Sequence, residues 1–221
     1  MGIAYNTSIV TDGLFIYYDP SNTRCYSGSA TTSYNLVGLN NGNLTNGAGF
    51  TSENSGTFTF DGTNDNIIIP NFPISGSFSV EIWCNAANLS TTYVMVGKYG
   101  GGGYDFWIGV SGTRFKFSIS LANKIEPQTE IISPNTWYHI CAVYNSSAIT
   151  ASIYLNGILA QTSNGSSIFQ NPPGDYAIGA FGANGGYYFP GKITCHKHYN
   201  RALSAAEVKQ NYNALRDRFG I

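Results

Sequence analysis

The chain has 221 residues, of which 43% are hydrophobic and only 10% are charged, and its formal net charge at pH 7 is −1. Globular proteins usually carry about a quarter of charged residues, so this composition excludes a disordered chain. The even charge balance, with no basic cluster, argues against nucleic acid as a partner. A single all-β domain often reaches this length, so we expect one domain over residues 1–221.

Alternating apolar and polar residues predict about a dozen strands in this glycine-rich and aromatic-rich sequence. The predicted strands cover residues 14–19, 57–60, 66–69, 78–84, 93–98, 104–110, 114–121, 136–144, 149–155, 158–162, 176–181 and 191–199. One open sheet of this size would leave a whole apolar face in water. The sequence therefore predicts two packed antiparallel sheets, an all-β sandwich.

Turn signals separate these strands. Asn156 and Gly157 lie between two apolar runs and predict a two-residue hairpin, because both positions of such a turn need a positive φ. Four glycines at 100–103 predict a loop between two strands rather than a phosphate cradle, since no helical segment follows them.

A single helix is predicted at the C-terminus, over about 204–219. Ser204 and Glu207 form an S-x-x-E capping box, and Gly220 ends the segment. The apolar stripe consists of Val208, Tyr212, Leu215 and Phe219. An isolated amphipathic helix of this length is marginally stable, so the stripe should dock on a sheet of its own domain or on a neighbouring subunit. We expect docking within the domain.

Cysteine and histidine patterns favour packing over metal binding. The cysteines are widely spaced and are expected to be buried thiols: Cys25, Cys84, Cys141 and Cys195. His196 and His198 would point to one face of a strand and Cys195 to the other, so the three cannot close on one zinc ion without a bulge, and satisfied or exposed histidines are the preferred interpretation. His139, beside Trp137, is expected to be packed rather than catalytic.

Four segments, in this order, resemble the concanavalin A-like jelly roll in its laminin-G-like and pentraxin-like branch. They are FDGTNDNI at 60–67, FSVEIW at 78–83, WYHI at 137–140 followed by IYLNG at 153–157, and GKI at 191–193 leading to LSAAEV at 203–208. The resemblance covers nearly the whole chain and implies a jelly-roll fold. It does not by itself imply a function.

The ends of the chain are similar to stand-alone laminin-G-like proteins of tailed bacteriophages. The similar segments are GLFIYYDPSN at 13–22, NLVGLNNGNLTNG at 35–47, YNRALS at 199–204 and NYNA at 211–214. This resemblance implies a virion component, either a capsid decoration or a part of a tail or fibre. Residues 1–10 contain no secretion signal or membrane span, which fits assembly in the host cytoplasm.

An enzymatic function is not favoured. The β-glucanase branch of this fold uses paired carboxylates on one strand, whereas Glu81 has no other acidic residue within five positions. Glu126 and Glu130 flank a proline in a predicted loop, where a fixed catalytic separation is hard to maintain. We therefore expect no catalytic residues.

Calcium, bound weakly, is the one cofactor for which the sequence offers candidate ligands. Asp61, Asp65 and Asn66 offer clustered oxygen ligands, and Asp65-Asn66 matches the Asp-Asn pair of the pentraxin calcium site. The corresponding later loop offers only Asn184, so a hydrogen-bonded turn at Asp61-Gly62 is the preferred interpretation.

Aromatic residues in glycine-rich loops are the best binding signal. They are Tyr99, Tyr104, Tyr187, Tyr188 and Phe189, and they could stack on a sugar, contact another protein or pack at the rim of the sandwich. We expect a non-catalytic structural or decoration protein of a phage virion. Its expected partners are other virion proteins, and further copies of the same chain in a homo-oligomer are a second option. The alternative is an adhesin that binds a host surface polysaccharide.

Overall fold

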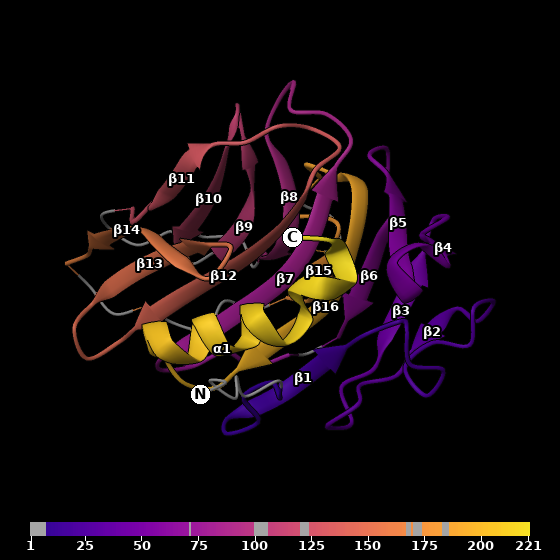
Figure 1. Cartoon of the computed structure of the whole chain (residues 1–221), viewed down its shortest axis with the longest axis horizontal. Coiled ribbons are helices and arrows are strands. Elements are labelled where there is room, and N and C mark those ends of the chain that lie inside the picture. Colours follow the sequence, from indigo (N-terminus) through magenta and orange to yellow (C-terminus); the bar gives the residue numbers. More distant parts are fainter. Residues whose placement is uncertain are drawn as a thin grey trace, which may run out of the picture.

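The computed structural model describes residues 8–70, 72–99, 106–119, 124–166, 169, 174–182 and 186–221. These residues form two antiparallel sheets packed face to face, with one α-helix near the C-terminus (Figure 1). The predicted all-β sandwich is therefore confirmed.

The first sheet has the strand order β14-β13-β12-β7-β16-β5-β4, and β1 also pairs with β16. Its strands are β1 (Leu14–Tyr18), β4 (Gly49–Thr51), β5 (Thr57–Asp61), β7 (Phe78–Ala86), β12 (Trp137–Asn145), β13 (Thr150–Leu155), β14 (Ile158–Asn164) and β16 (Pro190–Tyr199). The long strands β7, β12 and β16 lie at its centre and carry apolar residues toward the core.

The second sheet has the order β11-β10-β9-β8-β15-β6-β3-β2. Its strands are β2 (Thr32–Ser33), β3 (Gly42–Thr45), β6 (Asn66–Ile69), β8 (Tyr93–Lys98), β9 (Phe106–Ser111), β10 (Arg114–Ile119), β11 (Gln128–Ile131) and β15 (Tyr176–Ile178). Each predicted strand overlaps one of these sixteen, whereas β2, β3, β4 and β11 were not predicted. These four are short, and they carry too few alternating apolar residues to give a period-two signal.

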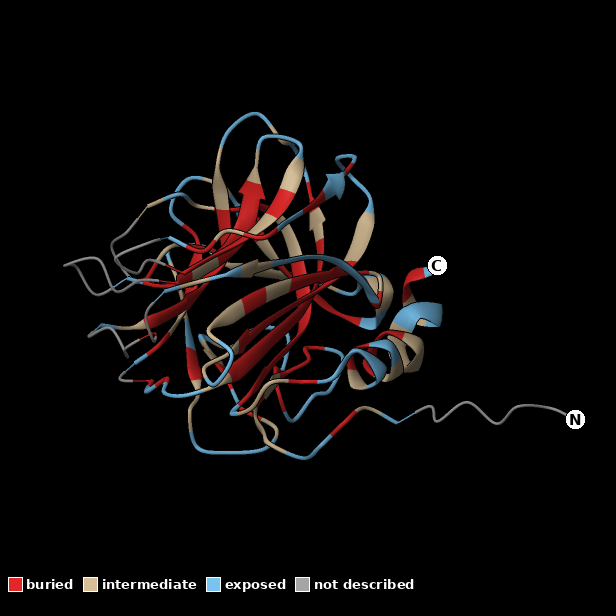
Figure 2. Ribbon diagram, turned by 90° about the vertical axis from the view of Figure 1, so that its left-hand side faces the viewer, coloured by how far each residue is buried: buried red, intermediate tan, exposed pale blue. Residues whose placement is uncertain are grey.

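The core lies between the sheets, where Figure 2 shows a band of buried strands. Phe78 of β7 meets Phe106 of β9 at a ring-centroid distance of 5.3 Å. Across the same interface, the Tyr176 hydroxyl and His196 Nε2 are 3.0 Å apart. The interior is thus mainly aromatic, with buried polar atoms joined across it.

Helix α1 (Ala205–Leu215) covers the outer face of the first sheet, in front of β7, β12 and β16 (Figure 1). The Ser204 side chain accepts from the Glu207 N–H in the predicted capping box, and a short 3-10 helix (Arg216–Phe219) follows. The Trp83 ring stacks on that of Phe219 at 4.0 Å. The helix therefore docks within its own domain, as expected, and the residues of β7 that face away from the core are also buried.

The predicted hairpin is confirmed by the backbone. Asn156 has φ 51° and Gly157 has φ 75° at the turn between β13 and β14. A Cβ on Gly157 would lie 3.0 Å from the Tyr212 Cβ, so the glycine also lets the helix approach the turn. Residues 100–103 lie outside the described residues.

The four cysteines and His139 are buried, as predicted, and His196 and His198 are buried as well. All four cysteines are described, buried and free of disulfides. His196 and His198 are buried against core aromatic rings, whereas Cys195 belongs to the cluster beneath the helix. In the described part of the chain, no group of three His, Cys, Asp or Glu side chains could hold a metal ion. The described helices are too short or too polar to cross a bilayer.

Candidate functional site

A cleft of about 360 Å³ opens on the outer face of the second sheet. Phe106, Ile108 and Val110 of β9 point into the core, so Trp107 and Ser111 point outward. The residues that line the cleft are Thr92, Val94, Trp107, Ser111, Lys116, Lys124, Glu126, Phe181 and Tyr187. They come from β8 and the residue before it, from β9 and β10, from the segment before β11 and from the segment that follows β15.

Two glycines lie in strands β8 and β9, next to residues that line the cleft. Gly97 of β8 pairs with Trp107 of β9, and a Cβ on Gly97 would lie only 2.9 Å from the Phe181 ring. Gly109 pairs with both Val94 and Lys116, and a Cβ there would lie 2.1 Å from the Tyr93 carbonyl oxygen. Side chains at either position would push into the ring or the neighbouring strand, so both positions favour glycine.

Aromatic rings form one wall. Phe181 meets Tyr99 at a centroid distance of 5.1 Å and Tyr187 at 6.4 Å. Tyr187 is 56% exposed and has φ 56°, an uncommon backbone conformation for a bulky residue. Its carbonyl oxygen accepts a hydrogen bond from the Val94 N–H at 2.7 Å, which ties this segment to β8. The exposed ring of Tyr187 is thus held over the sheet by its backbone.

Charged side chains form the other part of the lining. Glu126 Oε1 lies 2.6 Å from Lys124 Nζ, and Glu126 Oε2 lies 3.6 Å from Lys116 Nζ. The Ser118 hydroxyl donates to Glu126 Oε1 at 2.9 Å. Burial would raise the pKa of Glu126, but the hydrogen bonds from Lys124 and Ser118 and the charge of Lys116 hold it below its usual value. Glu126 is therefore ionised at neutral pH.

The structure brings together only some of the aromatic residues predicted for binding. Tyr99 and Tyr187 flank Phe181 with exposed rings, and the half-buried Tyr188 forms a bridge with Val94. Phe189 was wrongly predicted to be accessible, because its ring is fully buried in the core. In a regular strand Tyr187 and Phe189, two positions apart, would face the same side, but the left-handed backbone of Tyr187, with φ 56°, breaks this alternation. Tyr104 lies outside the described residues.

Sequence reasoning missed Trp107, Lys116, Glu126 and Phe181 as lining residues. Trp107 had a usable signal, since it occupies an outward position between Phe106 and Ile108, which face the core. Phe181 had none, because it fell at the end of a predicted strand that actually stops at Ile178. The chain then turns and lays Phe181 over Gly97.

The candidate calcium ligands form a hydrogen-bonded turn. Asp61 Oδ1 accepts from the N–H groups of Thr63 at 2.7 Å and Asn64 at 3.4 Å. Asp65 Oδ2 accepts from the Asp61 N–H at 2.9 Å, while its buried Oδ1 has no described partner. Asn66 Oδ1 accepts from a threonine hydroxyl. Calcium takes six to eight oxygen ligands, so the described residues do not fit a calcium shell and favour the turn.

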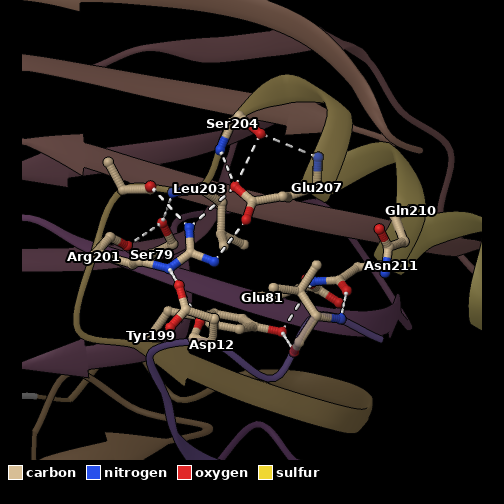
Figure 3. A network of polar contacts seen from close by, with 12 residues as sticks. Asp12, Ser79, Glu81, Tyr199, Arg201, Leu203, Ser204, Glu207, Gln210 and Asn211 are labelled. Carbon is tan, nitrogen blue, oxygen red and sulfur yellow. Dashed lines mark hydrogen bonds and ion pairs between the residues drawn. The ribbon is translucent and has the colours of Figure 1, made fainter. Parts of the chain in front are cut away.

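Glu81 lies beneath helix α1 rather than in the cleft (Figure 3). Its carboxylate forms an ion pair with Lys197 and lies 3.2 Å from His139 Nε2, and all three side chains are fully buried. Asn211 of the helix donates to Glu81 Oε2 at 2.7 Å. Burial alone would raise the pKa of Glu81, but the charges of Lys197 and His139 outweigh it and hold the pKa at about 2. This carboxylate has no access to a substrate.

The family described as the concanavalin A-like lectin/glucanases superfamily matches residues 61–209. The chain belongs to this superfamily. The match spans the strands from β6 to β16 and reaches into helix α1, so it includes every strand that lines the cleft. No curated protein matches the sequence significantly.

Solved structures share the superfamily's fold at low sequence identity. Domain 4 of an extracellular GH43 arabinanase from Geobacillus stearothermophilus, in complex with arabinotriose, is 16% identical with a TM-score of 0.70, covering 90% of this chain and 98% of that one. A sialidase of Trypanosoma rangeli is 14% identical with a TM-score of 0.71, covering 96% and 34%. The receptor-binding domain of botulinum neurotoxin type G is 16% identical with a TM-score of 0.67, covering 91% and 51%. The chain thus spans about half of the toxin domain and a third of the sialidase.

Proposed function

We propose that this superfamily member binds glycans, without cleaving them, in the cleft on the outer face of the second sheet. The observation that carries the proposal is the joint lining of one cleft by Trp107, Tyr187 and the ionised Glu126. Aromatic faces pack against the C–H face of a sugar ring, while charged groups form hydrogen bonds with its hydroxyls. A sugar needs both kinds of contact.

The dimensions of the cleft and the comparisons support this proposal. Its volume falls within the range of roughly 300 to 1,000 Å³ that is usual for ligand sites. The arabinanase domain of the same fold was solved with arabinotriose, and cell entry of botulinum neurotoxin type C, which also shares the fold, depends on interaction with two ganglioside molecules. Binding by this chain is our extension from those proteins.

The absence of catalysis is part of the proposal. Glycoside hydrolysis generally requires two carboxyl groups on either side of the scissile bond. Glu126 is the single carboxylate among the described lining residues, and it is held by two lysines. Glu81 is covered by the helix, and Glu130 lines a different groove. We expect no turnover of glycans that bind.

A glycan array followed by calorimetry tests the proposal. Trp107→Ala and Tyr187→Asn should each weaken binding of an array hit at least about tenfold, consistent with losing a stacked ring. Asn is chosen at 187 because it tolerates the left-handed backbone. Tyr34→Ala is the control, since Tyr34 is similarly exposed, at 53%, but does not line the cleft. Full binding by both cleft variants, or an array without hits, would refute the proposal.

A second function, attachment to other proteins of a tailed-phage particle, is proposed from the edge of the sandwich that β11 and β14 form. There Ile158 is 65% exposed, Ile131 is 68% exposed, and a groove of about 390 Å³ runs beside Leu159. The Gln128 N–H donates to Gln161 Oε1 at 2.8 Å, which links edge strands β11 and β14. Exposed apolar residues on an edge strand are typical of protein contacts, including contacts between copies. Many weakly binding copies on one particle would gain avidity for a surface polysaccharide.

Incorporation into particles tests this second function. Ile158→Lys with Leu159→Lys should abolish assembly of the protein into virions, whether on the capsid or on the tail. The same double variant should keep its glycan affinity, because neither residue lines the cleft. Normal incorporation of the double variant would contradict the proposed attachment edge.

A further inference from the structure

We propose that the sugar bound in this cleft is acidic and that its carboxylate is held by Lys116 and Lys124. This inference rests on the proposed glycan binding and names its substrate class. A neutral sugar needs no net charge in its site, whereas a carboxylate needs a compensating cation to leave water. The lining contains two lysines and one glutamate, so its described charges sum to +1.

Among the described residues, the contacts of the two lysines do not use all of their donors. Lys124 Nζ lies within hydrogen-bonding distance of Glu126, whereas Lys116 Nζ, at 3.6 Å, is beyond it and has an attractive contact only. Each ammonium group carries three N–H donors. The two lysines can therefore bind a carboxylate of the ligand while they keep their contacts with Glu126.

Lys116 is better placed to bind a carboxylate than a lysine on the open surface would be. It projects from β10 and pairs with Gly109 of β9, which has no side chain, and the Lys116 side chain is only 21% exposed. Partial burial reduces solvent screening, so the ammonium group attracts an anion more strongly than an open surface lysine does. Lys124 also lines the cleft but is more exposed, with 53% of its side chain accessible to solvent.

The aromatic wall makes an acidic sugar the fitting anion. Trp107 and Tyr187 offer ring faces that a small inorganic anion would not use. A carboxylate on a sugar ring occurs in uronic acids and in sialic acids, and both present a C–H face together with the charge. We propose that the site recognises this combination of a carboxylate and a C–H face. The experiment below decides whether a uronic acid or a sialic acid supplies it.

Matched pairs of acidic and neutral ligands test the inference by calorimetry at low salt. Trigalacturonic acid is compared with its methyl ester, and 3′-sialyllactose with lactose. We expect at least one acid to bind about fivefold or more tightly than its neutral counterpart, and this preference to shrink as salt is raised. The pair that shows the preference identifies the source of the carboxylate.

Charge variants then assign the preference to this cleft. Lys116→Gln and Lys124→Gln should each reduce the ratio of acid to neutral affinity severalfold, while Glu126→Gln should increase it, because the net charge of the cleft changes in opposite directions. Lys209→Gln makes the same charge change on the exposed face of helix α1 and should leave the ratio unchanged. Thermal melts of each variant establish that it is folded.

The outcomes separate this inference from the proposed function. Equal binding of acid and neutral ligands would overturn the inference and leave glycan binding intact. A preference that all three cleft variants leave unchanged would also overturn it, because the carboxylate would then bind elsewhere. If neither these ligands nor any array glycan binds, the proposed function fails as well.

Discussion

The side chain of Asn211, in the middle of helix α1, donates a hydrogen bond to the Glu81 carboxylate of β7 at 2.7 Å. Its carbonyl oxygen accepts from the Val10 N–H at 2.7 Å, and its amide also donates to the Tyr199 hydroxyl at 3.0 Å. One helical residue thus joins the N-terminal segment, β7 and β16 (Figure 3). The helix is an integral layer of the fold that encloses a buried charge.

Glu81→Gln should destabilise the fold by about 3 to 5 kcal/mol, because it leaves the fully buried Lys197 without its opposite charge. Urea unfolding measures the change in the free energy of unfolding. Glu53→Gln is the control, because Glu53 pairs with Lys192 on the surface and its loss should cost about 1 kcal/mol at most. Equal effects of the two variants would show that the buried pair is not a critical contact.

Ser204→Ala should lower stability by about 1 kcal/mol, because the hydroxyl accepts the otherwise unpaired N–H of Glu207 at the start of the helix. The Glu207 carboxylate also bonds with Arg201, so the cap is coupled to the chain before it. Ala206→Ser, which adds a hydroxyl inside the first turn, should change thermal stability much less. A larger loss for Ala206→Ser would argue against the cap.

The stability of the fold should decrease as the pH falls from about 7 to 4. Burial lowers the pKa of His198 well below its usual value, with His196 and Lys98 adding to the effect, and burial lowers the pKa of His196 to about 3. The unfolded chain binds these protons near pH 6.5 and the folded chain does not, so acid favours unfolding. At pH 5 each such group costs about 2 kcal/mol.

His198→Phe tests the assignment of this pH dependence. Both ring nitrogens of His198 lack a hydrogen-bond partner among the described residues, and Phe72 and Phe78 lie against the ring. The variant should therefore keep its stability at pH 7 and lose less of it at pH 5. Urea unfolding at the two pH values gives the comparison. An unchanged slope with pH would exclude His198 as a contributor.

Gly97→Ala should weaken glycan binding about fivefold, because its Cβ would lie 2.9 Å from the Phe181 ring and 3.1 Å from Val94 Cγ1. The ring has to move, and the aromatic wall moves with it. Gly76→Ala controls for a general loss of stability, since it strains a turn with φ 67° but meets no atom within 4 Å. Unchanged affinity in Gly97→Ala would show that the position of Phe181 does not matter for binding.

Calcium should have no effect on the folded protein. The Asp61 carboxylate is engaged by the amides of its own turn, and Asp65 by the Asp61 N–H. Thermal melts with millimolar calcium and with EDTA should agree, because a ligand stabilises a fold only when it binds the folded state. A rise of more than about 2 °C with calcium would contradict the turn interpretation.

The fold could be predicted from local patterns that survive in a single sequence. The alternation in 78–84, the Asn156-Gly157 turn and the Ser204 and Glu207 box each depend on neighbouring residues. The burial of Glu81 could not be predicted in this way. It depends on Asn211 and Lys197, which are more than a hundred positions away and meet it only after the helix has docked.

The cleft was predicted only in part for the same reason. Of the predicted aromatic residues, Tyr187 lines the cleft and Tyr99 packs against Phe181 beside it, and both carry the local signal of an aromatic residue near glycines. Lys116 and Glu126 became neighbours through the path of the chain from β10 to β11, and their charge pairing has no local sequence signal. Phe189 was misplaced because glycine-rich flanks do not reveal which side of an extended segment faces the core.

The most direct test of glycan binding in the cleft is a nitrogen–proton NMR titration with an oligosaccharide chosen from the array. The indole N–H signal of Trp107, assigned with Trp107→Phe, should shift on addition of the ligand. That of Trp83, which is buried beneath the helix, should not shift. A bound glycan that leaves the Trp107 signal in place would contradict the central claim.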